Sequence, residues 1–246
     1  MRKGKILRRV LIGALFCALA IYGVTVFLSR QAIKNYSVHG VDVSSYQGEI
    51  DWIELQKNGI DFAFIKATEG SGYVDKMFSQ NIGGISKTDV APGAYHFMSF
   101  ESDGKSQAEN FIATVKKEKI LLPPVIDLEL YGRYNYAPPD EETVTAILDD
   151  LISSLYAEYG KMPIIYTNRR AYSLYVSGRY KDCDIWICDV VKKPELPDGR
   201  KWLFWQYSHT GKLSGYSGSE KHIDLNLFSG TDKEFKEYII KRAVTK

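Results

Sequence analysis

Two acidic residues, two positions apart in an apolar segment, could carry chemistry in this sequence. Asp127 and Glu129 interrupt the otherwise apolar run Pro123–Leu130. Side chains alternate along a strand, so a strand here places both carboxyl groups on one face and Ile126 and Leu128 on the other. Like charges ~6.6 Å apart at Cα raise the pKa of one group, which then stays protonated near neutrality. Such a pair can cleave a glycosidic bond, because one group protonates the leaving oxygen while the other supports the positive sugar carbon.

The same spacing also has a purely structural interpretation. Each carboxyl group could be bridged to a Lys or Arg side chain, and structural ion-pair networks shift pKa values as catalytic sites do. The spacing of Asp127 and Glu129 therefore leaves both interpretations open.

Two further acids lie within apolar strand patterns. Asp42 lies in the run Val38–Val43, and Asp224 lies in the run His222–Leu227. The carboxyl ends of parallel barrel strands converge on one mouth, so four acids from three strands would form a negatively charged cleft. The alternative for each single Asp is a helix cap or a local turn.

Aromatic and amide side chains near the ends of the expected strands are candidates for sugar binding. Flat rings match the apolar faces of sugars, and Tyr and Gln side chains bond to hydroxyl and acetamide groups. The candidates are Tyr95, His96, Tyr166, Trp186, Trp205 and Gln206. Core packing is the alternative for most of them, and a satisfied core histidine is the alternative for His96. Lys66 and Glu69 are either an ion pair at the mouth or surface charges.

The elements that must position these residues alternate between strands and helices, which predicts a parallel sheet with right-handed crossovers. Expected strands are Val38–Val43, Phe62–Thr68, Ala91–Met98, Pro124–Leu130, Met162–Asn168, Asp184–Asp189, Trp202–Tyr207 and His222–Leu227. Expected helices are Trp52–Asn58, Lys76–Ser86, Lys105–Lys119, Glu141–Tyr159 and Lys233–Lys246. Eight strands suffice to close a barrel, and the shorter later connections predict an irregular second half.

The N-terminal segment reads as a membrane anchor. Residues 10–28 carry no charge, which is close to the ~20 residues that cross a bilayer as a helix. Five basic residues lie in positions 1–9, so the N-terminus is expected to be cytoplasmic and the rest of the chain extracellular. Residues 29–37 are expected to form a linker to a domain spanning 38–246. The alternative is a signal peptide that is cleaved to release a secreted protein.

Charge and cysteine usage exclude other classes. Residues 1–34 hold seven basic and no acidic side chains, which leaves 25 basic against 30 acidic side chains in the remainder. An acidic domain is a poor nucleic-acid binder, so no nucleic-acid partner is expected. Cys183 and Cys188 are five positions apart on an expected strand, too far for a disulfide, and are expected to be free thiols. No metal-site spacing is present, so neither a metal nor a cofactor is expected.

Eight ordered blocks resemble the glycoside hydrolase family 25 lysozymes. The first block is Val-His-Gly-Val-Asp-Val-Ser-Ser-Tyr-Gln-Gly at 38–48. The others are Ile50–Trp52, Phe64–Gly70, Pro92–Phe97, Pro124–Glu129, Ile165–Asn168, Trp205–Tyr207 and Ile223–Asn226. Together they span residues 38–228, which makes the resemblance highly specific.

The resemblance implies a flattened, irregular (β/α) barrel, TIM-like, with about five βα units plus extra strands. It implies β-1,4-N-acetylmuramidase activity on peptidoglycan glycan strands, between N-acetylmuramic acid and N-acetylglucosamine. Glu129 matches the general acid of the family's Asp-x-Glu motif, and Asp127 matches the first acid, which either assists through the substrate acetamide or stabilises the charged transition state. Asp42 and Asp224 match acids that shape the sugar subsite.

A retaining mechanism, a monomer and a role in wall remodelling complete the hypothesis. Three rival functions remain open: a chitinase-like hydrolase, a wall-binding module without catalysis, and a membrane scaffold that has no affinity for glycans.

Overall fold

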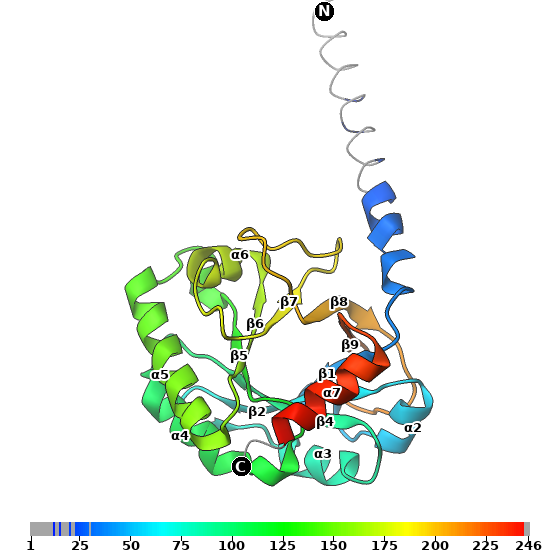
Figure 1. The fold of residues 1–246 in the computed structure, drawn as a ribbon, viewed down its shortest axis with the longest axis horizontal. Coiled ribbons are helices and arrows are strands. Elements are labelled where there is room, and N and C mark those ends of the chain that lie inside the picture. Colours follow the sequence, from blue (N-terminus) through cyan, green and yellow to red (C-terminus); the bar gives the residue numbers. More distant parts are fainter. Residues whose placement is uncertain (1–11, 13–14, 16–19, 21–22, 30, 244–246) are drawn as a thin grey trace, which may run out of the picture.

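The computed structural model describes residues 1–246 except 1–11, 13–14, 16–19, 21–22, 30 and 244–246. Within the described residues, nine strands form one sheet in the order β1-β9-β8-β7-β6-β5-β4-β2-β3, and β1 also pairs with β2. That last pairing closes eight strands into a barrel (Figure 1), with β3 as an added edge strand. The strands are β1 His39–Val43, β2 Phe62–Glu69, β3 Tyr73–Val74, β4 Ala91–Phe97, β5 Val125–Leu128, β6 Ile164–Asn168, β7 Ile185–Cys188, β8 Phe204–Gly211 and β9 Ile223–Phe228.

The barrel is mixed in strand direction, which the sequence did not predict. Strands β1, β2, β4, β5, β6, β7 and β8 pair in parallel, whereas β9 runs antiparallel to both β1 and β8. The segment between β8 and β9 contains no crossover helix, so β9 returns beside β8 as a hairpin and then pairs with β1. The eight expected strands are all present, and β5 ends one residue before Glu129.

Helices cover the outside of the barrel and one of its ends. They are α2 Trp52–Lys57, α3 Phe78–Ile85, α4 Gly104–Thr114, α5 Glu141–Tyr159, α6 Arg169–Ala171 and α7 Asp232–Ala243, with short 3-10 or π turns at Ser45–Gln47, Lys117–Lys119, Gly132–Asn135 and Tyr172–Val176. Side-chain caps fix where the long helices begin: the Asp103 carboxylate accepts from Ser106 N, and the Asp140 carboxylate accepts from Thr143 N. Gly160 ends α5 in the left-handed conformation, with φ of 63°.

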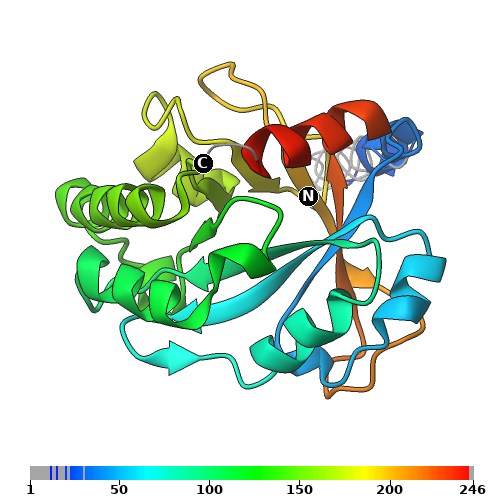
Figure 2. The same ribbon diagram turned by 60° about the horizontal axis from the view of Figure 1, so that its bottom comes forward.

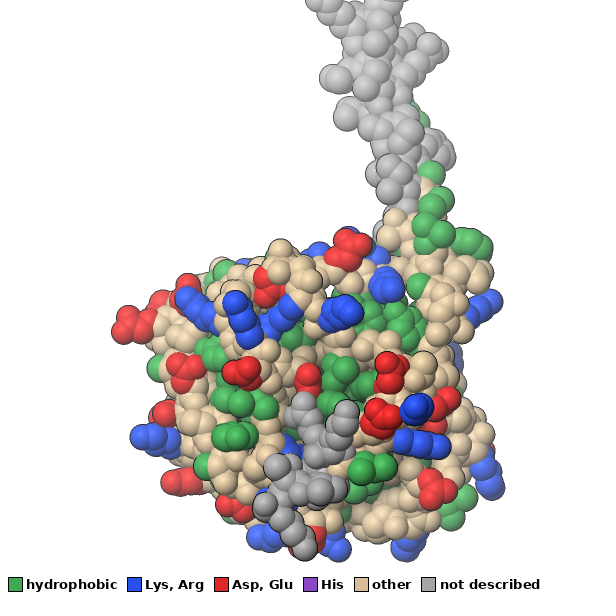
Figure 3. All heavy atoms as spheres, viewed as in Figure 1, with side chains coloured by type: hydrophobic (Ala, Val, Ile, Leu, Met, Phe, Trp, Pro, Cys, Tyr) green, Lys and Arg blue, Asp and Glu red, His purple; other side chains and the backbone are tan. Residues whose placement is uncertain are grey.

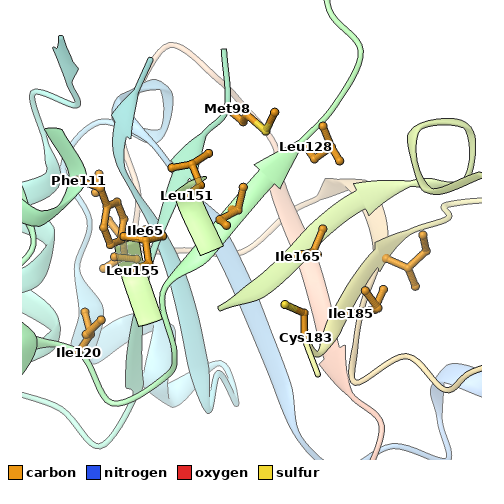
Figure 4. Packing of buried hydrophobic residues seen from close by; sticks show 14 of the residues in the cluster. Ile65, Met98, Phe111, Ile120, Leu128, Leu151, Leu155, Ile165, Cys183 and Ile185 are labelled. Atoms are coloured by element: carbon orange, nitrogen blue, oxygen red, sulfur yellow. The ribbon is translucent and has the colours of Figure 1, made fainter. Parts of the chain in front are cut away.

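Two apolar layers follow from the alternation of side chains along the strands. The outward-facing residues pack against the helices, for example Ile65, which lies near Phe111 of α4 and Leu155 of α5 (Figure 4). The inward-facing residues form a separate cluster inside the barrel, in which Phe62, Phe64, Phe204, Phe228 and Phe235 contact one another edge to face or tilted.

Helix α7 lies across one end of the barrel (Figures 1 and 2), where Phe235 packs on Phe62 and Phe228. These rings belong to the amino end of β2, to α7 and to the carboxyl end of the antiparallel β9. The interior is therefore filled from the end covered by α7, and a cleft opens at the opposite end of the parallel strands.

Helices α4 and α5 approach each other closely because Gly104 has no side chain. A Cβ at this position would lie 2.2 Å from the carbonyl oxygen of Ile147 and 2.6 Å from Cβ of Asp150. A larger residue would therefore push α5 away from the barrel.

The N-terminal segment is only partly described. Residues 1–9 and most of the anchor expected at 10–28 lie outside the described residues. Among the described residues, no helix combines the length and apolarity needed to cross a bilayer. Residues 23–29 and 31–33 are helical, so part of the segment expected to be a linker belongs to helical structure.

Candidate active site

A cleft of about 500 Å³ opens at the carboxyl ends of the parallel strands. Its lining residues come from almost every barrel strand and from the loops after β1, β5 and β8: Asp42, Val43, Ser44, Tyr46, Gln47, Lys66, Tyr95, Phe97, Asp127, Glu129, Tyr166, Trp186, Gln206, His209, Glu220, His222 and Asp224. The four acids expected to meet at one mouth therefore do so. Active sites of barrel proteins form at this end of the strands.

Asp127 and Glu129 both face the cleft, as their spacing predicts. Asp127 is 6% exposed, and its Oδ1 is buried without a hydrogen-bond partner among the described residues. Burial and the neighbouring Glu129 raise the pKa of Asp127 well above its ordinary value. Burial also raises the pKa of Glu129. The hydrogen bond from Asn168 Nδ2 to its Oε1, at 3.3 Å, opposes this rise but is the smaller effect. The pair therefore retains a proton at a pH where exposed carboxyl groups are ionised.

Asp42 and Asp224 form a second acid pair, held by amide donors. They are cross-strand partners on β1 and β9. Gln206 Nε2 donates to Oδ2 of Asp42 at 2.8 Å and to Oδ2 of Asp224 at 3.3 Å, and Asn226 Nδ2 donates to the same Asp42 oxygen at 2.7 Å. Burial and the charge of Asp224 nevertheless raise the pKa of Asp42 to about 7.

The donors themselves are fixed by aromatic residues on the floor of the cleft. Tyr166 Oη donates to Gln206 Oε1 at 2.9 Å, and the indole Nε1 of Trp186 donates to Asn226 Oδ1 at 2.8 Å. Each amide oxygen is thus engaged, so each amide nitrogen must point to Asp42. The Trp186 ring also stacks on Phe64 with centroids 4.4 Å apart, which joins the floor to the barrel interior.

Tyr95, Tyr166, Trp186 and Gln206 line the cleft as expected from the sequence, whereas His96 and Trp205 do not. His96 is fully buried on the helix-facing side, where Nδ1 lies 2.7 Å from Thr68 Oγ1 and Nε2 lies 3.0 Å from Gln107 Oε1. Its pKa is lowered to about 4 by burial, so the ring is neutral.

Trp205 packs against Trp202 in the outer layer and donates its indole N–H to the carbonyl oxygen of Asp189 at 2.8 Å. His96 directly follows Tyr95, and Trp205 directly precedes Gln206; both of these neighbours line the cleft. The strand alternation therefore turns His96 and Trp205 away from the cleft.

Two cations face the acids from opposite sides of the cleft. Lys66 forms an ion pair with Glu69 at 2.6 Å and lies 5.0 Å over the ring of Phe97. Of the two alternatives for Lys66 and Glu69, the ion pair at the mouth is therefore the one observed. On the other side, His209 Nδ1 lies 3.7 Å from Asp224 Oδ1. The Asp224 carboxylate and the adjacent Cys188 thiol raise the pKa of His209 to about 10.

Sequence reasoning did not select Asn168, Asn226 and His209 as site residues. A usable signal existed for the two amides, because each is a polar residue within an apolar strand run. His209 carried no such signal, since it lies in the polar stretch that follows Tyr207. Among the described residues, no group of three or more His, Cys, Asp or Glu side chains is arranged to hold a metal ion.

A closed α/β barrel whose carboxyl end holds paired carboxyl groups above an aromatic floor has the architecture of a glycoside hydrolase. The sequence profile of glycosyl hydrolases family 25 matches residues 41–216. The chain belongs to this family, which confirms the resemblance found in the eight sequence blocks.

Relatives of known structure or curated sequence agree with this assignment. A family 25 glycosyl hydrolase from Bacillus anthracis is 54% identical, with a TM-score of 0.79 over 83% of this chain and 94% of that chain. A bacterial lysozyme from Streptomyces coelicolor is 30% identical, with a TM-score of 0.76 over 84% of this chain and 98% of that chain. Lysozyme M1 of Streptomyces globisporus is 33% identical over 205 residues, which are 79% of this chain and 68% of that protein.

Proposed function

We propose that this protein is a peptidoglycan muramidase that hydrolyses the β-1,4 bond between N-acetylmuramic acid and N-acetylglucosamine. The observation that carries the proposal is the joint exposure of Asp127 and Glu129 to one cleft with an aromatic floor. Family membership and the lysozyme relatives support the same substrate class.

In this mechanism Glu129 is the general acid. It lies just beyond the end of β5, less buried than Asp127, where it can reach the oxygen of a bound glycosidic bond. Burial raises its pKa and so favours the protonated form, and in the proposed mechanism it gives this proton to the leaving sugar. The resulting carboxylate then removes a proton from the water that displaces the intermediate formed in the first step, and the two successive displacements at the sugar carbon retain its configuration.

Asp127 supports the positive charge that develops at the sugar carbon. Two routes fit its buried, unpaired Oδ1: accepting the N–H of the substrate acetamide while the acetamide oxygen attacks, or stabilising the charged centre directly. Either route gives Oδ1 a partner only when the substrate is bound, so the cost of burying the group is recovered in the complex.

The second acid pair and the aromatic floor hold the sugar. Asp42 has both of its donors on Oδ2, which leaves Oδ1 for a substrate hydroxyl. Tyr95, Tyr166 and Trp186 offer ring surface to the apolar faces of the sugars.

Residues 10–28 are proposed to anchor the chain in the cell membrane, with residues 1–9 cytoplasmic and the barrel extracellular. The uncharged run and the preceding basic residues support this placement. The anchor favours a role in wall remodelling, in which the enzyme acts as a monomer on glycan near the membrane. Cleavage of the segment and secretion is the alternative outcome.

Mass analysis of the sugars released from purified peptidoglycan, after borohydride reduction, tests the proposal. A muramidase yields products whose reduced end is muramitol, whereas glucosaminitol ends would assign a different bond. Release of soluble ends from chitin oligomers at an equal rate would favour the chitinase-like alternative. An unchanged yield from the variant Glu129→Gln would contradict the catalytic assignment, and binding without any product would leave a wall-binding module.

A further inference from the structure

The N-terminal helical segment does not leave the barrel as a free tether. Ser29 is buried, and its Oγ accepts a hydrogen bond from the backbone N–H of Lys193 at 3.0 Å. Tyr36 packs on Trp202, with ring centroids 5.9 Å apart, and Lys193 Nζ lies 5.7 Å over the Tyr36 ring. The end of the segment is therefore fixed to the loop that joins β7 to β8, residues 189–203.

An exposed apolar surface continues from the helix onto this loop. Val190 and Val191 are 44% and 38% exposed at the start of the loop, and Phe27 and Leu28 are each 60% exposed on the helix. A hollow of about 290 Å³ separates the two parts and is lined from both sides, by Val26 and Ile33 among others on the helix, and by Val190 and Val191 on the loop. Figure 3 shows hydrophobic side chains gathered where the helix meets the barrel.

Basic side chains follow the two valines directly. Lys192 and Lys193 come next in the sequence, and Lys34 is exposed on the adjoining segment. The acid that precedes the valines, Asp189, is already paired with Arg169 at 2.9 Å, whereas Glu195 is the nearest acid that follows. The segment Val190–Lys193 is thus basic, within a loop of four basic and three acidic side chains, on a domain in which acids outnumber bases.

We propose that Val190–Lys193 form a membrane-contact surface that rests on the anionic phospholipids of the bilayer holding the anchor. The proposal rests on the membrane anchor of the proposed function. The uncharged run ends at Leu28, and the next residue, Ser29, is bonded to Lys193, so the loop lies level with the end of the run. Valines at this level enter the interface, and each lysine near anionic headgroups adds an electrostatic attraction to the surface.

Charge complementarity selects lipid over a second copy of this chain as the occupant. Two copies would oppose lysines to lysines across a symmetric contact. An anionic bilayer attracts this loop and repels the rest of the acidic domain, which orients the barrel on the surface. The loop connects the strands that carry Trp186 and Gln206, and His209 lines both the hollow and the cleft. The contact would therefore hold the cleft at a fixed height above the bilayer.

Lysine acylation of the intact chain tests this inference without any substitution. The full-length protein is reconstituted in phosphatidylglycerol-containing vesicles, in phosphatidylcholine vesicles and in detergent micelles, and is treated with a membrane-impermeant acetylating ester. Mass spectrometry then gives the rate at each lysine. We expect acylation of Lys192 and Lys193 to be at least fivefold slower in the anionic vesicles than in detergent. Lys57 and Lys233, whose side chains are 71% and 87% exposed, are the internal controls and should react equally in both.

A charge-reversed variant sharpens the result. We also expect Lys34, on the adjoining segment, to be acylated more slowly in anionic vesicles than in detergent. Lys192→Glu/Lys193→Glu should abolish this difference, whereas the matched variant Lys57→Glu/Lys233→Glu should retain it. Equal acylation of Lys192 and Lys193 in all three environments, in a chain that floats with the vesicles, overturns the contact and leaves the anchor intact. A chain that does not float overturns both proposals. Protection in detergent that grows with protein concentration assigns the surface to self-association and also overturns the lipid contact.

Discussion

The cleft contains two pairs of acids whose surroundings differ. Asp42 receives two amide donors, from Gln206 and Asn226, and these amides are themselves held by hydroxyl and indole groups. Asp127, which is 6% exposed and more buried than Asp42, has an oxygen with no donor among the described residues. A buried polar atom without a partner is costly, and such atoms are concentrated where a ligand supplies the missing contact.

Under the proposed mechanism, the comparison separates binding from reaction within one acidic cleft. The pair on β1 and β9 is held in place before the substrate arrives, whereas the pair at the end of β5 is left to change its protonation and its partners.

Loss of the proton donor should have the largest effect. Glu129→Gln keeps the shape and can still accept from Asn168, but it cannot give a proton to the leaving oxygen. We expect kcat to fall by ~10³-fold, within the range for removal of a general acid. Turnover of peptidoglycan and thermal unfolding are measured together, and a folded variant that retains a tenth of the activity would refute the assignment.

Replacement of the unpaired acid should have a smaller but still large effect. Asp127→Asn presents an amide where the reaction needs an acceptor that stabilises positive charge, so we expect kcat to fall by ~10²-fold with little change in KM. Asn168→Ala, which removes only a donor to Glu129, is the control and should lose less. A wild-type kcat in Asp127→Asn would show that Asp127 has a structural rather than a catalytic role.

The Asp42–Asp224 pair should make the free energy of unfolding depend on pH. Its member Asp42 has a folded-state pKa of about 7, above the ordinary aspartate value of 3.8, so the folded protein holds this proton more tightly than the unfolded chain. The free energy of unfolding should therefore fall as pH rises from about 4 to about 7, by a few kcal/mol in order of magnitude. Asp42→Asn, measured by urea unfolding at pH 5 and pH 8, should lack this loss. The same pH dependence in wild type and variant would show that Asp42 is already ionised.

Substitution of His209, the cation next to Asp224, should have the smallest effect on kcat. His209 is positively charged in neutral solution, and its charge lowers the pKa of Glu129. His209→Gln should raise the pKa of Glu129, so the general acid stays protonated to higher pH and the alkaline limb of the kcat profile moves up by less than ~1 unit. His209→Lys should keep the wild-type limb, and a limb that moves down in His209→Gln would contradict the argument.

The sequence predicted the strands and the first acid pair because both depend on local alternation. Asp127 and Glu129 stand out against an apolar run, and the spacing of two assigns them to one face. The alternation of side chains also shows why the predicted list of sugar-binding residues was too long. Tyr95 and His96 are consecutive, as are Trp205 and Gln206, so only one of each can face the cleft. Which member faces inward depends on the strand register, which is set by tertiary pairing.

Long-range partners could not be predicted in this way. The direction of β9 and its position between β8 and β1 depend on barrel closure across most of the chain. The contacts of His209 with Asp224 and Cys188 depend on that closure as well, since the three residues lie on neighbouring strands. No local pattern in the sequence encodes such contacts.

The insertion of β9 beside β1 has a consequence for how the enzyme is made. Asp42 is reached early in synthesis, whereas Asp224 and Asn226 are reached only within the last tenth or so of the chain. A growing polypeptide that already contains Asp127 and Glu129 still lacks one wall of the cleft and the amides that hold Asp42. A copy that stops before β9 would therefore carry Asp127 and Glu129 without Asp224, Asn226 or a closed barrel.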